Sequence, residues 1–419
     1  MLAVILGHTD GKNGSTEVDP RLIIGGLSLV ERAMLAAQRA GVRRSVVVGA
    51  LDPGGAMAAR LRARGADVTF IDWPALAHLD FSDGVLLIRN GVLVEPRALG
   101  VLLDHYGTHD DLDGVLVAGS SAGDAGLAIV PANASGALFG ATAVEELWAR
   151  LARIEPRREV SVAPFFCRRL ESDSDLAAAE TAYIRHQNGR ESFFTKKIRR
   201  FSVPLTRVLV RRGVSPNQVT LLGLLLAAAA AIAVSVDVYI VSLAGALLYY
   251  SSMILDCSDG EVARLSFRDS RFGAWFETVV DYVTYFLLLG GLVLASQRHG
   301  RPRLDVEAAM VALTASLVVA AVAGYLRLRV AGNDPGRFDD ASAAVLRSST
   351  KFHRFARWGR QWIKRSTIAH LVVAFAVVNQ LWVLIYLWAF GAVVAAVVII
   401  GVEPFVVRRV KVAAPGMRA

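Results

Sequence analysis

The sequence has little cysteine. Cys167 and Cys257 are the only two cysteines among 419 residues, which excludes a disulfide scaffold and a zinc site built from cysteines. The first fourteen residues, MLAVILGHTDGKNG, begin with an apolar run but lack a basic region and a cleavage site. We therefore expect this segment to begin with a buried strand and not to be a signal peptide.

Charged residues are also sparse. They make up 20% of the chain, whereas 54% is apolar and the mean hydropathy is +0.44. These values exclude a disordered chain and are too apolar for an ordinary soluble protein. Residues 1–192 carry 19 basic and 24 acidic side chains, and residues 193–419 carry 27 and 13. A basic, apolar second half is typical of a membrane domain with Lys and Arg in its cytoplasmic loops, so the basic excess does not require a nucleic-acid partner.

The first half contains short apolar, β-rich runs that alternate with helical patterns. The expected helices are 27–40 and 53–64, and the expected strands are 2–7, 44–50, 67–72, 84–89, 114–119 and 126–131. This alternation predicts an α/β domain on a mostly parallel sheet, over residues 1–190.

The opening strand, a glycine-bearing loop, Pro20 and the stretch Gly25–Arg32 resemble the sugar-phosphate nucleotidyltransferase family. The resemblance implies a glycine-rich loop with an arginine around a triphosphate, a lysine before the proline and a metal-binding aspartate after a later strand. These features suit a triphosphate, because its charge needs backbone N–H donors, positive side chains and a metal ion.

The sequence departs from that pattern at each of these points. The loop GHTDGKNG keeps Lys12 but lacks the arginine spacing, Asp19 precedes Pro20, and the later strand ends in Arg89 and Asn90 where the metal-binding aspartate is expected. We predict a domain that keeps the fold and has lost transferase activity; an active cytidylyltransferase and an unrelated α/β domain are the alternatives.

From residue 218 the pattern becomes that of a membrane domain, 218–410. Six apolar stretches are expected to span the bilayer, at 218–236, 239–258, 274–295, 306–328, 367–379 and 381–407. Four basic clusters, around Lys196, Arg264, Lys351 and Arg408, fall on one side of six spans together with the first domain. The positive-inside rule makes that side cytoplasmic, in a multi-pass protein of the cell (inner) membrane. Arg298, Arg301 and Arg303 lie on the opposite side and are the minority.

Two basic segments adjoin this domain's spans, one before the first span and one before the fifth. The linker 191–217 contains FFTKKIRRFSVPLTRVLVRR, a mixture of aromatic, aliphatic and basic residues that predicts an amphipathic helix on an anionic leaflet; a solvated linker is the alternative. Lys351–Arg365 mixes basic residues with Phe and Trp. It predicts either a lipid-headgroup anchor or a nearby site for a phosphorylated acceptor, which Arg would bind through bidentate contacts.

Four carboxylates near the second and third expected spans carry the clearest chemical signal. Asp256 and Asp259 are spaced i, i+3, and Glu277 and Asp281 are spaced i, i+4, so each pair shares a helix face. A charge in the bilayer costs about 2.5–3.5 kcal/mol, and four carboxylates repel one another. Divalent cations with a preference for oxygen ligands, such as Mg²⁺, Mn²⁺ or Ca²⁺, would remove both costs.

The segment from Asp256 to Asp281 resembles the signature of the CDP-alcohol phosphotransferase family, D-x2-D-G-x2-A-R-x8-G-x3-D-x3-D. Seven of the eight defined positions match with the spacing intact, and the departure is Glu277 at the third aspartate. Ser215–Thr220 resembles the family's proline-asparagine-threonine element. The combination with the first domain resembles the fused inositol-phosphate cytidylyltransferase and di-myo-inositol phosphate phosphate synthase proteins.

The resemblance implies roles for these residues. Asp256, Asp259, Glu277 and Asp281 would hold two Mg²⁺ or Mn²⁺ ions, and Asp281 would also be the general base. The residues implied for the nucleotide are Gly260, Ala263, Arg264 and Gly273, with Asn217 and Thr220 lining the pocket. The substrates would be a CDP-alcohol, either CDP-inositol or CDP-diacylglycerol, and a polar alcohol acceptor such as inositol phosphate. The family also implies a homodimer in the lipid bilayer.

Two other functions remain open at this stage. The glutamate at position 277 allows a non-catalytic membrane scaffold or a nucleotide-sensing protein, and intramembrane carboxylates on six spans also occur along ion paths in transporters. The glycines and the Ala263–Arg264 pair that accompany the carboxylates favour the transferase.

Overall fold

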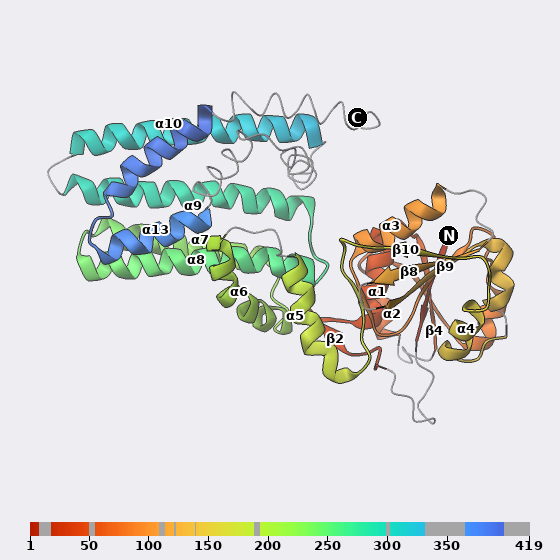
Figure 1. Cartoon of the computed structure of the whole chain (residues 1–419). Helices are drawn as coiled ribbons and strands as arrows, with labels where there is room; N and C mark the ends of the chain where they lie inside the picture. The colour runs from red at the N-terminus through yellow and green to blue at the C-terminus, as the bar shows by residue number, and fades with distance from the viewer. Residues whose placement is uncertain are drawn as a thin grey trace. The chain divides into compact units, whose positions relative to one another are not determined.

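The computed structural model describes residues 1–7, 18–49, 55–108, 114–120, 123–138, 140–187, 193–298, 302–331 and 365–397. The chain divides into two compact units (Figure 1). The first comprises Met1–Gly189 with Leu265–Phe267, and the second comprises Arg190–Arg264 with Arg268–Ala419. We call them the head and the helical unit.

The head is built on a seven-stranded sheet with the order β10-β8-β9-β6-β1-β4-β5. Its strands are β1 (Leu2–Leu6), β4 (Arg44–Val48), β5 (Asp67–Ile71), β6 (Val85–Ile88), β8 (Val115–Ser120), β9 (Gly123–Val130) and β10 (Arg157–Ser161). All pairings are parallel except those of β9 with β6 and β8. The prediction of an α/β domain on a mostly parallel sheet is confirmed, and all six expected strands are present.

Helices cover both faces of this sheet. On one face α1 (Leu29–Arg39), α2 (Ala56–Arg62) and α3 (Pro96–Gly107) pack against the apolar side chains of the strands. On the other face lies α4 (Val144–Leu151), with Trp73 and Leu76. The helix α1 begins after Ser28 because Ser28 and Glu31 form a capping box. Both core layers are continuous, which explains the burial of nearly every residue of β1 and β6.

The helical unit starts with α6 (Phe193–Arg211), followed by α7 (Pro216–Ser235), α8 (Tyr239–Leu265), α9 (Arg271–Gln297), α10 (Pro302–Ala331) and α13 (Arg365–Val377). Figure 1 shows α8, α9 and α10 running alongside one another. Their core is formed largely by small and aliphatic side chains such as Ala230, Ala246, Leu288, Ala312 and Val372. Small residues at the contacts let the helices approach closely, as in membrane bundles.

Four helices are long and apolar enough to cross a membrane: Pro216–Ser235, Tyr239–Leu265, Arg271–Gln297 and Leu304–Val322. They correspond to the first four expected spans. The fifth and sixth are not confirmed, because the structure shows shorter apolar helices at Arg365–Val377 and Val383–Val397. The fifth ends early because Asn379 adopts a positive φ of 56°, which terminates a helix. Residues 398–407 of the sixth expected span lie outside the described residues.

Candidate active site

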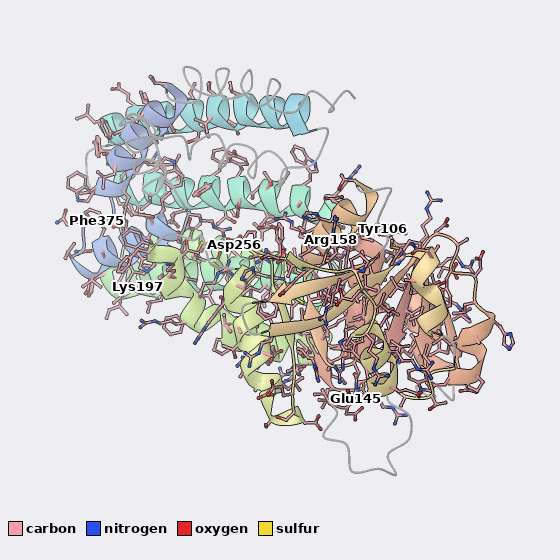
Figure 2. All side chains as sticks on the ribbon, turned by 45° about the vertical axis from the view of Figure 1, so that its right-hand side comes forward. Tyr106, Glu145, Arg158, Lys197, Asp256 and Phe375 are labelled. Carbon is pink, nitrogen blue, oxygen red and sulfur yellow. The ribbon has the colours of Figure 1, made fainter. Side chains whose placement is uncertain are left out.

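The helices α8 and α9 bring the four predicted carboxylates together. Only five residues separate the end of α8 from the start of α9, so the two helices run in opposite directions and their acidic ends adjoin. Asp259 is repelled by the charges of Asp256 and Glu277, and Asp281 is repelled by the same two side chains. Asp256 lies among the side chains of the neighbouring helices (Figure 2). The side chains of Asp256 and Asp281 are 15% and 34% exposed, so substrate could still reach both.

Arg365, the first residue of α13, binds two of these carboxylates. Its Nη1 donates to Oδ1 of Asp256 at 2.6 Å and also contacts Oδ1 of Asp281, while Nη2 donates to Ser252 at 3.0 Å. The guanidinium is only 6% exposed. A single cationic nitrogen therefore bridges one carboxylate from each acidic helix.

The cluster remains short of positive charge. Arg365 pairs with Asp256 and Asp281, and the charge of Arg264 acts on Glu277. Four carboxylates and two guanidinium groups leave a formal charge of −2. The donor set consists of oxygen atoms, which suits Mg²⁺ or Mn²⁺. The guanidinium of Arg365 brings positive charge between α8 and α9. Within the described part of the chain, no group of three or more His, Cys, Asp or Glu is arranged around a common metal position.

The third helix of the site, α7, contacts Asp259. Thr220 donates a hydrogen bond to Oδ2 of Asp259 at 2.6 Å, and the backbone N–H of Gly260 donates to Oδ1 at 2.6 Å. Thr220 also donates to the carbonyl of Pro216 at 3.2 Å, which fixes its hydroxyl in the first turn of α7. The side chain of Asp259 is thereby oriented from two directions, and its neighbour Thr220 belongs to the predicted nucleotide pocket.

Both glycines that the sequence assigned to the nucleotide site lie next to another residue assigned to that site. A Cβ on Gly260 would lie 3.1 Å from Nη1 of Arg264, and a Cβ on Gly273 would lie 3.7 Å from Oδ1 of Asn217. The Nε of Arg264 is buried and has no hydrogen-bond partner within the described residues. Gly260 therefore leaves room for the Arg264 guanidinium, which retains a donor for an anionic group. Ala263 lies in the same turn of α8, and its small side chain adds little bulk there.

Sequence reasoning missed Arg365 as a member of the site. It entered only as the last residue of a basic segment, of which residues 351–364 lie outside the described residues. A usable signal was its position at the start of an apolar stretch, where a lone charge needs a partner.

The head carries an arginine at the position where the sequence resemblance led us to expect a metal-binding aspartate. Arg89 follows β6, is 6% exposed, and pairs with Glu145 while its guanidinium lies 5.7 Å from the ring of Trp148. A buried guanidinium at that position repels a divalent cation. The backbone N–H of Asp19 donates a hydrogen bond to Oδ1 of Asp173, and Oδ1 of Asp19 accepts one from the backbone N–H of Arg21. The loop around Lys12 lies outside the described residues.

Comparison with known proteins shows which family part of the helical unit is similar to. Residues 213–346 match the family model of the CDP-alcohol phosphatidyltransferases. The family resemblance predicted from the signature is thereby confirmed for this part of the chain.

Individual relatives agree with the match. A bifunctional IPC transferase and DIPP synthase of Archaeoglobus fulgidus is 34% identical over 128 residues, which are 30% of this chain and 25% of that protein. A phosphatidylinositol phosphate synthase of Streptomyces avermitilis is 32% identical over 116 residues, 25% of this chain and 40% of that protein. The chain thus matches about a quarter to two fifths of the length of these two relatives.

Solved structures that resemble the chain include the inositol-1-phosphate CTP transferase from T. maritima. That structure is 13% identical, with a TM-score of 0.34, and the match covers 46% of this chain and 98% of that one. Rv0371c from Mycobacterium tuberculosis is 16% identical with the same TM-score, over 43% of this chain.

Proposed function

We propose that the helical unit is a membrane enzyme that transfers a substituted phosphoryl group from a CDP-alcohol to the hydroxyl of a second alcohol and releases CMP. The observation that carries this proposal is the acidic cluster of α8 and α9, within the segment that matches the CDP-alcohol phosphatidyltransferases. A partly buried cluster with a formal charge of −2 has no structural benefit of its own, because repulsion among its carboxylates destabilises the fold unless cations offset it.

The residues divide the chemistry among them. Asp281 takes the proton of the acceptor hydroxyl while that oxygen forms a bond to the phosphorus bearing the donor alcohol. The bond from this phosphorus to the CMP oxygen breaks, and CMP leaves with the electron pair. Arg365 contacts Oδ1 of Asp281 and offsets part of its negative charge, and we assign the proton of the acceptor to Oδ2.

Binding of the CDP-alcohol donor depends on all four carboxylates and on the residues around them. Asp256, Asp259, Glu277 and Asp281 would hold Mg²⁺ or Mn²⁺ in a two-metal site, and when bound these ions stabilise the negative charge of the diphosphate and of CMP as it leaves. Arg264 offers its buried Nε to a phosphate oxygen. The cytidine pocket would be lined by residues that are either small or short and polar: Gly260, Ala263, Gly273, Asn217 and Thr220.

The acceptor that suits this site best is a phosphorylated polyol such as inositol phosphate. Arg365 adds a buried guanidinium beside Asp281, and a phosphate group on the acceptor would gain from that charge. The donor is either CDP-diacylglycerol or CDP-inositol. Arg89 in the head argues that this chain does not make its own CDP-inositol, which favours the lipid donor.

The protein would lie in the cell (inner) membrane as a multi-pass protein with its head in the cytoplasm, where CDP-alcohols are available, and would act as a homodimer through its helices. The basic residues Lys196, Lys197 and Arg200 of α6 support this orientation, since they suit the anionic cytoplasmic leaflet.

A grid of substrates tests the proposal. Detergent-purified full-length protein is supplied with Mg²⁺ or Mn²⁺, with CDP-diacylglycerol or CDP-inositol, and with inositol, inositol phosphate, glycerol phosphate or serine. CMP release is measured, and the product is partitioned between organic and aqueous phases. An organic-phase product identifies the lipid donor, and an aqueous diester identifies CDP-inositol. Absence of acceptor-dependent CMP release with every pair would contradict the proposal.

A further inference from the structure

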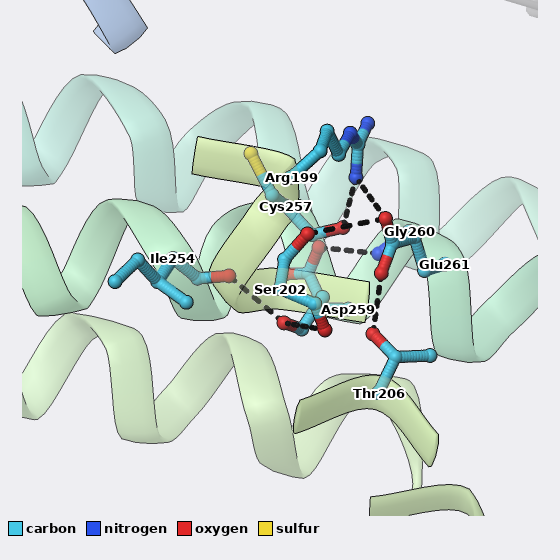
Figure 3. Close-up of polar contacts among 9 residues, drawn as sticks. Arg199, Ser202, Thr206, Ile254, Cys257, Asp259, Gly260 and Glu261 are labelled. Carbon is cyan, nitrogen blue, oxygen red and sulfur yellow. Dashed lines mark hydrogen bonds and ion pairs between the residues drawn. The ribbon is translucent and has the colours of Figure 1, made fainter. Parts of the chain in front are cut away.

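A fifth carboxylate lies on the opposite side of α8 from the candidate site. Glu261 is 2% exposed at its side chain and is bound by α6. Arg199 donates to its Oε1 at 2.8 Å and Ser202 to the same oxygen at 3.1 Å, while Thr206 donates to Oε2 at 2.5 Å. Figure 3 shows these three side chains directed at Glu261 from one face of α6.

The contact extends to the backbone of α8. The Nη1 that binds Glu261 also donates to the carbonyl of Cys257 at 2.7 Å. Ser258 donates to the carbonyl of Ile254 at 2.9 Å and to that of Ser202 at 3.5 Å. Arg199 therefore holds two successive turns of α8, and the side chains of α6 account for both oxygens of Glu261.

These are the two turns that carry Asp256 and Asp259. Each residue of an α-helix is rotated by 100° from the last, so Cys257, Ser258 and Glu261 face away from Asp256 and Asp259. A rotation or an axial shift of α8 at Glu261 would move both carboxylates of the candidate site. The contact with α6 lies within the helical unit, and Arg199, Ser202 and Thr206 are spaced i, i+3 and i+7 on one helix face.

We propose that Glu261 is a positioning residue: α6 holds it so that Asp256 and Asp259 keep the orientation that metal binding and Arg365 require. The inference rests on the function proposed above, because it assigns Asp256 and Asp259 to a metal site. Packing α6 against α8 does not in itself require a buried carboxylate whose two oxygens both accept hydrogen bonds. An apolar contact of equal size would hold the helices together at a lower desolvation cost.

The test compares two buried carboxylates in the full-length protein. Glu261→Gln keeps the shape and an acceptor oxygen but removes the charge that Arg199 binds. Asp305→Asn is the matched control, because Asp305 is 2% exposed, accepts a hydrogen bond from Tyr386 and lies on α10. For each variant we would measure Mn²⁺ binding by electron paramagnetic resonance, kcat and KM for CMP release, and the melting temperature.

We expect Glu261→Gln to weaken Mn²⁺ binding and lower kcat, each by about 10–100-fold, at a melting temperature no lower than that of Asp305→Asn. Arg199→Gln should produce the same losses, and the double variant should lose little more than either single variant, since both remove one contact. Should Glu261→Gln fail to fold, Thr206→Val removes one donor to the same carboxylate and should give a smaller loss of Mn²⁺ affinity.

The inference is overturned if Glu261→Gln binds Mn²⁺ as the unmodified protein does, or if its losses match those of Asp305→Asn. Mn²⁺ binding keeps the two proposals apart. If the unmodified protein binds Mn²⁺ but releases no CMP with any substrate pair, the proposed transfer fails while the positioning role is still decided by the binding data. If the unmodified protein binds no Mn²⁺, both fail.

Discussion

Arg365 forms an ion pair with Asp281, 84 positions earlier in the chain. The same guanidinium nitrogen binds Asp256 at 2.6 Å, so the first residue of α13 joins the acidic faces of α8 and α9. This pairing reduces the repulsion between two carboxylates that the proposed reaction needs in their ionised form. It also places a guanidinium, a group that suits phosphate, next to the proposed general base.

Substitution of Arg365 should impair use of a phosphorylated acceptor. Arg365→Lys keeps the charge, but a single ammonium cannot reproduce the planar fork that contacts Asp256, Asp281 and Ser252 together. We expect kcat/KM of Arg365→Lys for the phosphorylated acceptor to be about 10–100-fold lower than that of the unmodified protein. The kcat/KM of Arg365→Gln should be lower still. The control is Arg298→Lys, since Arg298 donates to the carbonyl of Ser235 at the other end of the bundle. Unchanged kcat/KM in Arg365→Gln would contradict the assignment.

Glu277 should be required for metal activation. Glu277→Ala removes one of four carboxylates from the cluster, and we expect the Mn²⁺ concentration for half-maximal CMP release to rise by about 10-fold or more. Glu277→Asp restores the family's residue and should support at least the activity of the unmodified protein. The measurement is a Mn²⁺ titration of initial rates. Equal titration curves for Glu277→Ala and the unmodified chain would remove Glu277 from the site.

Two adjacent glycines in α9 should respond differently to the same substitution. A Cβ on Gly291 would lie 2.5 Å from the carbonyl oxygen of Ala231 in α7, whereas a Cβ on Gly290 would meet nothing within 4 Å. Gly291→Ala should therefore destabilise the protein by about 1–3 kcal/mol through overpacking. Gly290→Ala should leave the stability unchanged or slightly raise it. Thermal unfolding in detergent separates them, and equal melting temperatures would argue against close packing of α7 on α9.

The head should not act as a nucleotidyltransferase. Its buried Arg89, paired with Glu145, occupies the position after β6 where a metal-binding carboxylate is expected. With CTP, inositol phosphate and Mg²⁺, the full-length protein should release pyrophosphate no faster than a blank without protein. Release at an ordinary enzymatic rate, about 1 s⁻¹ or more, would show that the head is active.

Local patterns allowed much of this architecture to be predicted. The alternation of strands and helices in the head, the first four apolar spans and the carboxylates at i, i+3 and i, i+4 depend on short-range periodicity, which the sequence displays directly. The roles of Arg365 and Glu261 could not be found in that way. Each depends on a partner from another helix that is distant in the sequence. Arg365 and Asp256 are 109 positions apart, and Arg199 and Glu261 are 62 positions apart. The expected boundary after residue 379 agrees with the positive φ of Asn379, but the lengths of the helices on either side could not be predicted from the apolar pattern.

The most direct test of the central claim is acceptor-dependent CMP release by the purified full-length protein, compared between the unmodified chain, Asp281→Asn and Asp305→Asn. We predict Mg²⁺- or Mn²⁺-dependent release by the unmodified chain and by Asp305→Asn. Asp281→Asn should lose about 10²–10⁴-fold in rate, because its amide cannot accept the proton of the acceptor hydroxyl. Full activity in Asp281→Asn would contradict the mechanism, and no release by the unmodified chain with any substrate pair would contradict the function.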